Sequence, residues 1–229
     1  MIIRTSAPTR IDLAGGTIDI WPLYLFHPGA QTLNAAISLR ASARIDPRAD
    51  SRITIKSLDT GAIVEANDWR ELRDVRQLRL LCLLVHFFEV HGLTLTTTSD
   101  SPAGAGIAGS SALNVAVCAA LAEWNRTHYE PEALLQIAMN VEAQAIAVPT
   151  GLQDYRPALY GGIAAIELEV DGVRRVPLDV DLGELQQRIV LCYTGEPRNS
   201  GTNNWEITKR HLDGDQYIFD CFERIRDTA

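Results

Sequence analysis

The sequence predicts an α+β fold, in which antiparallel strands and helices form separate groups along the chain. SRITIKSLD and GAIVEA, on either side of Asp59-Thr60-Gly61, alternate apolar and polar residues as in a hairpin. IAAIELEV and VRRVPLDV form a second such pair around Asp171-Gly172. Between these hairpins, the helical stretches 110–126 and 131–147 follow each other with no strand between them. A strictly alternating α/β order is therefore not expected.

The other elements follow from apolar periodicity and from Gly and Pro signals. Expected strands are residues 2–4, 10–14, 93–100 and 188–194, and expected helices are 71–91, 110–126, 131–147 and 215–229. TSAPT is expected to form a turn, and Gly92 to end the helix before it. The polar stretch 194–215 is expected to be a loop, either one that closes over a ligand or a plain surface loop.

Composition restricts the classes of function. The chain has 229 residues, of which 46% are hydrophobic, and a formal net charge of −8. An acidic chain of this kind argues against nucleic-acid and anionic-membrane partners. The longest apolar stretch, residues 78–90, is interrupted by Arg79, His86 and Glu89 and reads as a core helix. No signal-peptide pattern opens the sequence, and the four cysteines form no C-x-x-C pair, so we expect a cytoplasmic protein with reduced thiols.

The segment SPAGAGIAGSSALNVAV (101–117) carries a G-x-G-x-x-G spacing ahead of a helix. A dinucleotide site is disfavoured, because no second strand with an acidic residue follows. A Walker A loop is excluded by the absent lysine. Glycines before a helix N-terminus can also hold a polyphosphate through backbone amides. Taken alone, the segment equally allows a simple turn whose serines cap the helix.

Together with two other segments, this one favours the polyphosphate loop over the simple turn. PAGAGIAGSSA resembles the phosphate loop of the GHMP kinases, the family of galactokinase, homoserine kinase, mevalonate kinase and phosphomevalonate kinase. APTRIDLAGGTIDIW (7–21) looks like the family's N-terminal motif. PTGLQDYRPALYGGI (149–163) is similar to a motif of its heptose-7-phosphate kinase branch. Three motifs in family order are more specific than any one of them.

The resemblance implies a two-domain fold. Residues 1–187 would form the ATP-binding domain, which is like ribosomal S5 domain 2, and residues 188–229 would begin a ferredoxin-like C-terminal domain. That second domain is expected to be incomplete, because the glycine-rich third motif of the family is absent. Ala108 departs from the family pattern and adds a methyl group to a loop that should lie close to phosphates.

The resemblance also implies ATP and Mg²⁺ as cofactors. The residues expected to bind the nucleotide are Pro102, Gly104, Ala105, Gly106, Ala108, Gly109, Ser110 and Ser111. Ser110 and Glu142 are the expected magnesium ligands, since Mg²⁺ prefers oxygen donors and keeps several waters. A glutamate on a helix surface is the alternative reading for Glu142.

Asp154 matches the family's catalytic aspartate and Arg10 the cation beside it. A carboxylate there can accept the proton of the attacking hydroxyl as the phosphoryl group transfers. The cation would lower the pKa of that carboxylate and stabilise charge on the phosphoryl group. Each residue has a plainer alternative: Asp154 could cap the next helix, and Arg10 could form a structural ion pair.

The residues expected to bind the sugar are Asp19, Gly16, Thr17, Gln153 and Arg198, of which Arg198 would receive a substrate phosphate. The sequence therefore predicts a kinase that phosphorylates a hydroxyl of a sugar or sugar phosphate. A sugar-binding regulator with a kinase-like fold and no turnover is the second hypothesis. A homodimer stays open as the state of assembly.

Overall fold

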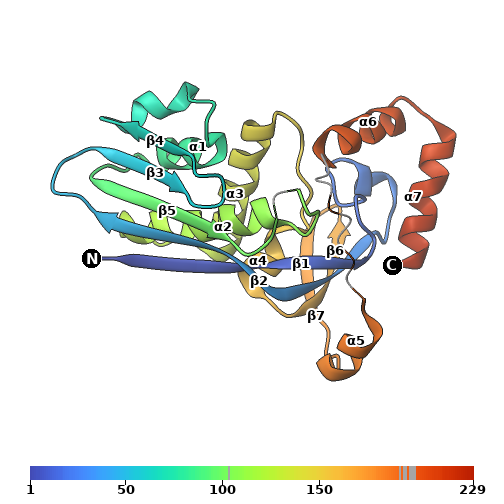
Figure 1. Cartoon of the computed structure of the whole chain (residues 1–229). Coiled ribbons are helices and arrows are strands. Elements are labelled where there is room, and N and C mark those ends of the chain that lie inside the picture. Colours follow the sequence, from blue (N-terminus) through green and yellow to red (C-terminus); the bar gives the residue numbers. More distant parts are fainter. Residues whose placement is uncertain (103, 191, 193–194, 196–199) are drawn as a thin grey trace.

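The structure is a computed structural model that describes residues 1–102, 104–190, 192, 195 and 200–229 (Figure 1). Its strands are β1 (Ile3–Ala14), β2 (Gln31–Pro47), β3 (Ile53–Ser57), β4 (Ile63–Ala66), β5 (Leu93–Ser99), β6 (Ile163–Glu169) and β7 (Gly172–Pro177). Its α-helices are α1 (Arg79–Phe88), α2 (Gly109–Trp124), α3 (Pro131–Ile146), α4 (Tyr155–Tyr160), α5 (Leu182–Arg188), α6 (Ser200–Leu212) and α7 (Gln216–Thr228). Two 3₁₀ helices, η1 (Leu23–Phe26) and η2 (Trp69–Asp74), complete the described elements.

Strand β2 organises the sheet because it is long enough to have different neighbours along its length. Its residues 41–47 pair with β5, whereas residues 31–35 pair with β6, and β1 pairs with it on the other side. The order is β4-β3-β5-β2-β6-β7, and every pairing is antiparallel except β3 with β5. Two parts of the sheet are thus joined through one strand.

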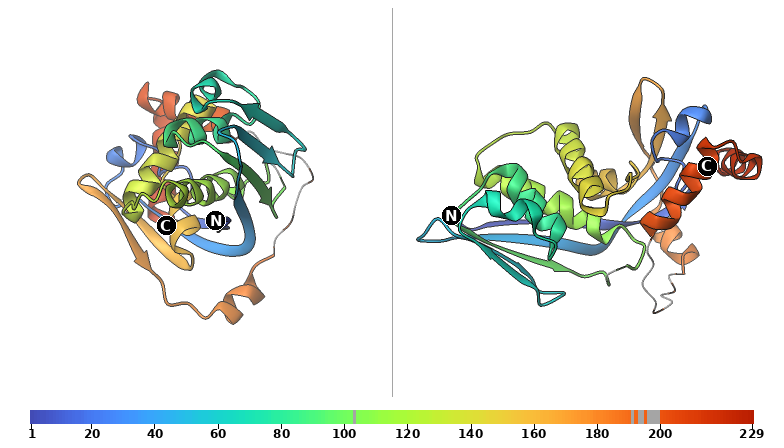
Figure 2. Two further views of the ribbon diagram at one scale, coloured as in Figure 1. Left: turned by 90° about the vertical axis from the view of Figure 1, so that its left-hand side faces the viewer. Right: turned by 90° about the horizontal axis from the view of Figure 1, so that it is seen from above.

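Helices α1, α2 and α3 cover one face of the sheet, as the view from above in Figure 2 shows. Helix α2 is rich in small residues and packs against β1 and β2, with most of its side chains buried. The apolar side chains of these helices and of the strands beneath them form the larger core. A second buried cluster joins the segment after β1, strand β6 and helix α7; its members include Ile18, Leu23, Leu152, Ile166 and Phe222. Helices α6 and α7 lie at the end of the molecule opposite the N-terminus (Figure 1).

A β-bulge in β1 turns two consecutive side chains inward. The register passes from Pro8 opposite Arg40 to Arg10 opposite Ala36, and both Thr9 and Arg10 are buried. In a regular strand, adjacent side chains would point to opposite faces. The bulge therefore allows Arg10 to face the helical side.

Most elements expected from the sequence are confirmed. Both hairpins, the strand at 93–100 and the helices at 110–126, 131–147 and 215–229 are present within three residues at each end. The expected turn at TSAPT is wrong, because these residues continue β1 through its bulge.

The expected helix at 71–91 is divided. Residues Trp69–Asp74 form η2, and α1 begins only at Arg79, after Leu78 adopts a left-handed conformation (φ 49°). The helix ends at Phe88, and Glu89, not Gly92, is its left-handed C-cap. An apolar pattern cannot report such a break, because both pieces bury the same kind of residue.

The carboxyl-terminal expectations also need correction. The polar stretch expected as a loop contains α6, whose last turn carries Lys209, Arg210 and His211, where cations favour a helix C-terminus. The strand expected at 188–194 is not present at 188–190, since Arg188 ends α5 and no strand follows at the next two residues. Residues 191, 193 and 194 lie outside the described part.

Across the described ranges of the chain, no helix is both long and apolar enough to cross a membrane. The four cysteines, Cys82, Cys118, Cys192 and Cys221, are free.

Gly15 directly follows β1 and has a positive φ of 76°, and a Cβ there would lie 2.1 Å from the backbone oxygen of Gln31. We expect Gly15→Ala to lower the free energy of unfolding by about 3 kcal/mol or more, because backbone strain and a backbone clash add. Gly61→Ala is the matched control: φ is +67° but no atom lies within 4 Å of the new Cβ. It should cost about 1 kcal/mol. Urea denaturation measures both, and equal losses would contradict the clash.

Candidate active site

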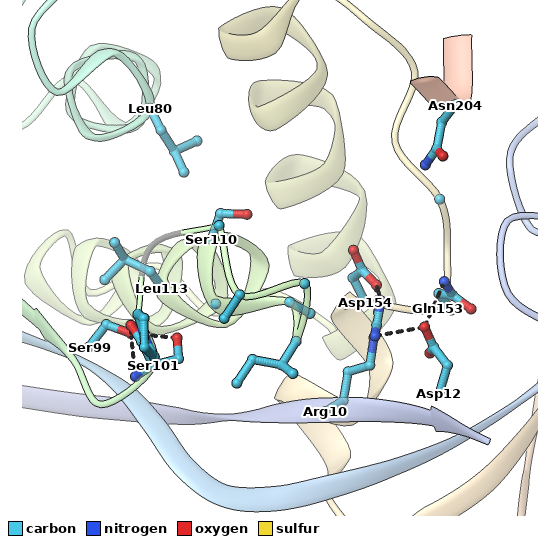
Figure 3. A pocket seen from close by; sticks show the side chains of 18 of the residues that line it. Arg10, Asp12, Leu80, Ser99, Ser101, Ser110, Leu113, Gln153, Asp154 and Asn204 are labelled. Carbon is cyan, nitrogen blue, oxygen red and sulfur yellow. Dashed lines mark hydrogen bonds and ion pairs between the residues drawn. The ribbon is translucent and has the colours of Figure 1, made fainter. Parts of the chain in front are cut away.

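A cavity of about 530 Å³ lies between β1 and the N-terminus of α2. Its lining comes from β1 and the segment after it, the glycine segment, the start of α1, the residues before α4, and α6. In Figure 3, Arg10, Asp12, Gln153 and Asp154 gather on one side, and Leu80, Leu113, Ser99 and Ser101 lie on the other. The polar end with the charged side chains and a mixed end of leucines and serines therefore lie on either side of Ser110.

The N-terminus of α2 presents uncapped amides to this cavity. The first intrahelical bond runs from the Ala112 amide to the Ala108 carbonyl, and no side chain among the described residues caps the helix. The amides of Gly109, Ser110 and Ser111 thus have no acceptor within the helix. Of these, Gly109 and Ser110 line the cavity. The helix dipole and free N–H groups make this a favourable place for an anion.

The loop before α2 is held on two sides. The Arg10 amide donates to the Ile107 carbonyl at 3.1 Å, which ties the loop to β1. On the other side, Gly109 lies against Ser101, whose Oγ would be 2.5 Å from a Cβ at that position. The Ser101 hydroxyl in turn lies 3.0 Å from that of Ser99 at the end of β5. The loop that lines the anion site is therefore fixed to the sheet.

Arg10 and Asp154 are direct partners. The Nε of Arg10 donates to Oδ1 of Asp154 at 3.0 Å, and Nη2 binds the same oxygen. Nη1 pairs with Oδ2 of Asp12 at 2.7 Å. Burial alone would lower the pKa of Arg10, but the charges of Asp154 and Asp12 outweigh it and raise that pKa. Asp154 precedes α4 but makes no capping hydrogen bond, so the capping alternative fails.

Asp19 and Gln153 each hold a buried oxygen to which none of the described residues donates. Oδ2 of Asp19 accepts the Gln153 amide at 2.8 Å, whereas its Oδ1 and the side-chain oxygen of Gln153 have no donor in the part of the chain that the structure describes. Gly151 lies so close that a Cβ would be 2.2 Å from Oδ2. Burial, and then the charge of Asp154, raise the pKa of Asp19 to about 7. Both residues line the cavity, so a ligand with hydroxyl donors could satisfy both oxygens.

Glu142 lies behind the wall of the cavity. Its Oε2 accepts hydrogen bonds from Tyr155 at 2.7 Å, Ser111 at 3.1 Å and Asn114 at 3.3 Å. Burial raises the pKa of Glu142, and the hydroxyls of Tyr155 and Ser110 counteract that rise. Within the described residues, no group of three His, Cys, Asp or Glu side chains could hold a metal. A metal bound beside Ser110 would need phosphate and water oxygens in addition.

The structure brings most of the expected site residues into one cavity. The residues found in its lining are Arg10, Gly16, Thr17, Asp19, Pro102, Gly104, Ala105, Gly106, Ala108, Gly109, Ser110, Gln153 and Asp154. Ser111 and Glu142 are buried just behind it, and Arg198 lies outside the described residues. Asp12 and the leucines of α1 were not expected; the position of Asp12, two residues after Arg10 in a strand, could have indicated it.

Comparisons with known proteins identify the family of the chain. Residues 75–162 match the family model "GHMP kinases N terminal domain". The chain is 31% identical over 239 residues to D-glycero-alpha-D-manno-heptose 7-phosphate kinase of Campylobacter jejuni, covering 99% of this chain and 69% of that kinase. It is 26% identical to the bifunctional fucokinase/GDP-fucose pyrophosphorylase of Arabidopsis thaliana, covering 99% of this chain but only 23% of that protein.

Among solved structures, a D-glycero-D-manno-heptose 1-phosphate kinase from Bacteroides thetaiotaomicron has the same fold. The TM-score is 0.72 at 23% sequence identity, and the match covers 100% of this chain and 79% of that one. The match to the heptose 7-phosphate kinase of Campylobacter jejuni extends along 99% of this chain. The chain belongs to the GHMP kinase family.

Proposed function

We propose that this protein transfers the terminal phosphoryl group of ATP to a hydroxyl of a sugar or sugar phosphate. The observation that carries the proposal is the pairing of two sites in one cavity. Uncapped amides at the N-terminus of α2 suit the phosphates, and two buried oxygens without donors, on Asp19 and Gln153, suit the hydroxyls of a sugar. The Arg10–Asp154 pair shares the polar end of that cavity with the two oxygens.

The chemistry follows from these groups. Asp154 accepts the proton of the attacking hydroxyl, whose oxygen forms a bond to the terminal phosphorus of ATP as the bond to the β-phosphate oxygen breaks. Arg10 stays charged beside it and holds the carboxylate in place. Its charge, together with the amides of α2, stabilises negative charge on the transferring group.

The opposite end of the cavity suits the nucleoside. Leu78, Leu80, Leu81 and Leu113 provide apolar contacts for a base, and Ser57, Asp59 and Thr60 provide polar groups nearby. Mg²⁺ would be held by the Ser110 hydroxyl and Glu142 with phosphate oxygens and water, because these are hard oxygen donors. When bound, the ion neutralises charge on the phosphates.

A heptose phosphate is the substrate we favour. The support is the GLQDY segment, which contains Gln153 and Asp154, and the similarity to the heptose phosphate kinase of Campylobacter jejuni. We also propose a domain boundary near residue 187, with residues 188–229 beginning a second domain. A cytoplasmic location is consistent with the four free cysteines.

Replacing the proposed base tests the reaction. With ATP, Mg²⁺ and a panel of sugars that includes heptose 7-phosphate, we expect sugar-dependent ADP release. Asp154→Asn should lower kcat by about 10²–10⁴-fold, because the proton acceptor is lost. Asp171→Asn, in the exposed β6–β7 turn, is the control and should leave kcat unchanged. A sugar-dependent rise in Tm without ADP release would contradict the kinase function and support the sugar-binding regulator instead.

Sugar binding should depend on pH through Asp19. Its pKa of about 7 means that the free protein is largely protonated there at pH 6. A hydroxyl that donates to Oδ1 favours the ionised carboxylate, so affinity should rise by about tenfold from pH 6 to pH 8. Calorimetry in buffers of different ionisation enthalpy should show about one proton released per sugar bound at pH 6. Asp19→Asn should abolish that release, whereas Asp171→Asn should keep it; persistence in Asp19→Asn would assign the titration elsewhere.

Glu142→Gln tests the magnesium site. The amide oxygen can keep the hydrogen bonds from Tyr155, Ser111 and Asn114, but the charge is lost. We expect the Mg²⁺ concentration for half-maximal activity to rise about tenfold or more. The metal-free Tm at pH 7 should stay equal or increase, since a buried charge is removed. An unchanged Mg²⁺ requirement would show that Glu142 is not a ligand.

A further inference from the structure

Three polar side chains on paired strands form a chain of hydrogen bonds that ends at Arg10. Asn34 of β2 lies directly opposite Asp12 of β1 in the sheet register. Its Nδ2 donates to Oδ1 of Asp12 at 2.6 Å, and the Thr32 hydroxyl donates to its Oδ1 at 3.1 Å. Thr32 and Asn34 are buried (0% and 1% exposed), and neither lines the cavity.

The chemistry of the partners fixes the direction of the Asn34 amide. An ionised carboxylate only accepts hydrogen bonds, so the NH₂ group must face Asp12. The amide oxygen is then left facing Thr32, whose hydroxyl supplies a proton. Both bonds form in one orientation only, and the sheet holds Asn34 and Asp12 in place on adjacent strands.

Asp12 determines which edge of the Arg10 guanidinium faces Asp154. Its Oδ2 takes Nη1 of Arg10, so that Nε and Nη2 remain for Oδ1 of Asp154. The same Asp12 oxygen accepts Nε2 of Gln153 at 3.4 Å, next to the proposed sugar site. Without the bond to Asp12, Arg10 could rotate and present its two terminal nitrogens to Asp154.

From these contacts we infer that Thr32, Asn34 and Asp12 are positioning residues that orient Arg10, and through it Asp154, for phosphoryl transfer. The inference rests on the proposed function. Thr32 and Asn34 act without touching a substrate, so breaking the chain should slow the chemical step and leave ATP binding intact. A displacement of about 1 Å at a reacting group can cost about 10²-fold in rate.

An exchange of side chains separates this role from simple packing. Asn34→Asp places two carboxylates opposite each other, and Asp12→Asn removes the charge that binds Nη1. Each single variant should lower kcat about 10- to 100-fold, with KM for ATP within about twofold of wild type. The double variant D12N/N34D restores a donor facing an acceptor, keeps the total charge and keeps an acceptor for Thr32. Its kcat should be at least about tenfold higher than that of N34D.

Thr54→Val is the matched control for Thr32→Val. Both remove a buried hydroxyl from a strand, but Thr54 bonds to Arg48, far from the chain of Thr32, Asn34 and Asp12. At a similar loss of Tm, only Thr32→Val should lower kcat. Equal kcat in both variants, or no recovery in D12N/N34D, would overturn the positioning role while leaving the kinase function standing.

A measurement that does not depend on catalysis tests the inference even if the protein is not a kinase. The ¹⁵N–¹H signal of the Arg10 Nε group, assigned by its loss in Arg10→Lys, reports the bond to Asp154. We expect it to move in N34D and in D12N and to return toward the wild-type position in D12N/N34D. An unchanged signal in both single variants would refute the inference whether or not the wild type releases ADP.

Discussion

The site depends on Arg10 being held on several sides at once. The bulge in β1 turns its side chain inward, and its backbone amide binds the Ile107 carbonyl of the glycine loop. Its guanidinium is divided between Asp12 and Asp154, and its charge stays fixed because those carboxylates offset the cost of burial. One residue therefore connects the loop proposed to hold phosphates with the carboxylate proposed to accept a proton. A shift in β1 would move both at once.

Several groups in and behind this cavity destabilise the folded protein as it stands. Asp19 and Gln153 bury oxygens without donors, and burial raises the pKa of both Asp19 and Glu142. An unsatisfied buried polar atom costs about 1–3 kcal/mol. These costs persist because the surrounding core is large, and a ligand that supplies hydroxyl donors or a cation would remove them. The same residues that reduce stability would thus favour such a ligand in the proposed site.

The sequence and the structure agree best where short sequence motifs identify the residues of the site. The motifs around Arg10, Gly104 and Asp154 indicated residues up to 144 positions apart, and the fold places them in one cavity. Asp12 could have been found from its spacing to Arg10, but Asn34 could not, because its contact with Asp12 depends on the register of β1 against β2. Helix α6 was missed since its residues are mostly polar, and the break at Leu78 depends on a left-handed backbone that an apolar pattern does not encode.

Charge separates the two ends of the reaction path. At one end, the guanidinium of Arg10 lies among the carboxyl groups of Asp12, Asp19 and Asp154, so acidic groups outnumber the cation. At the other, the N-terminus of α2 offers amides and a positive dipole with no acidic side chain capping it. The amides of α2 would therefore hold the polyphosphate at the second end, and the carboxyl groups would accept hydroxyl donors at the first. Arg10 lies at the first end, where its charge would meet the terminal phosphoryl group as it approaches the hydroxyl.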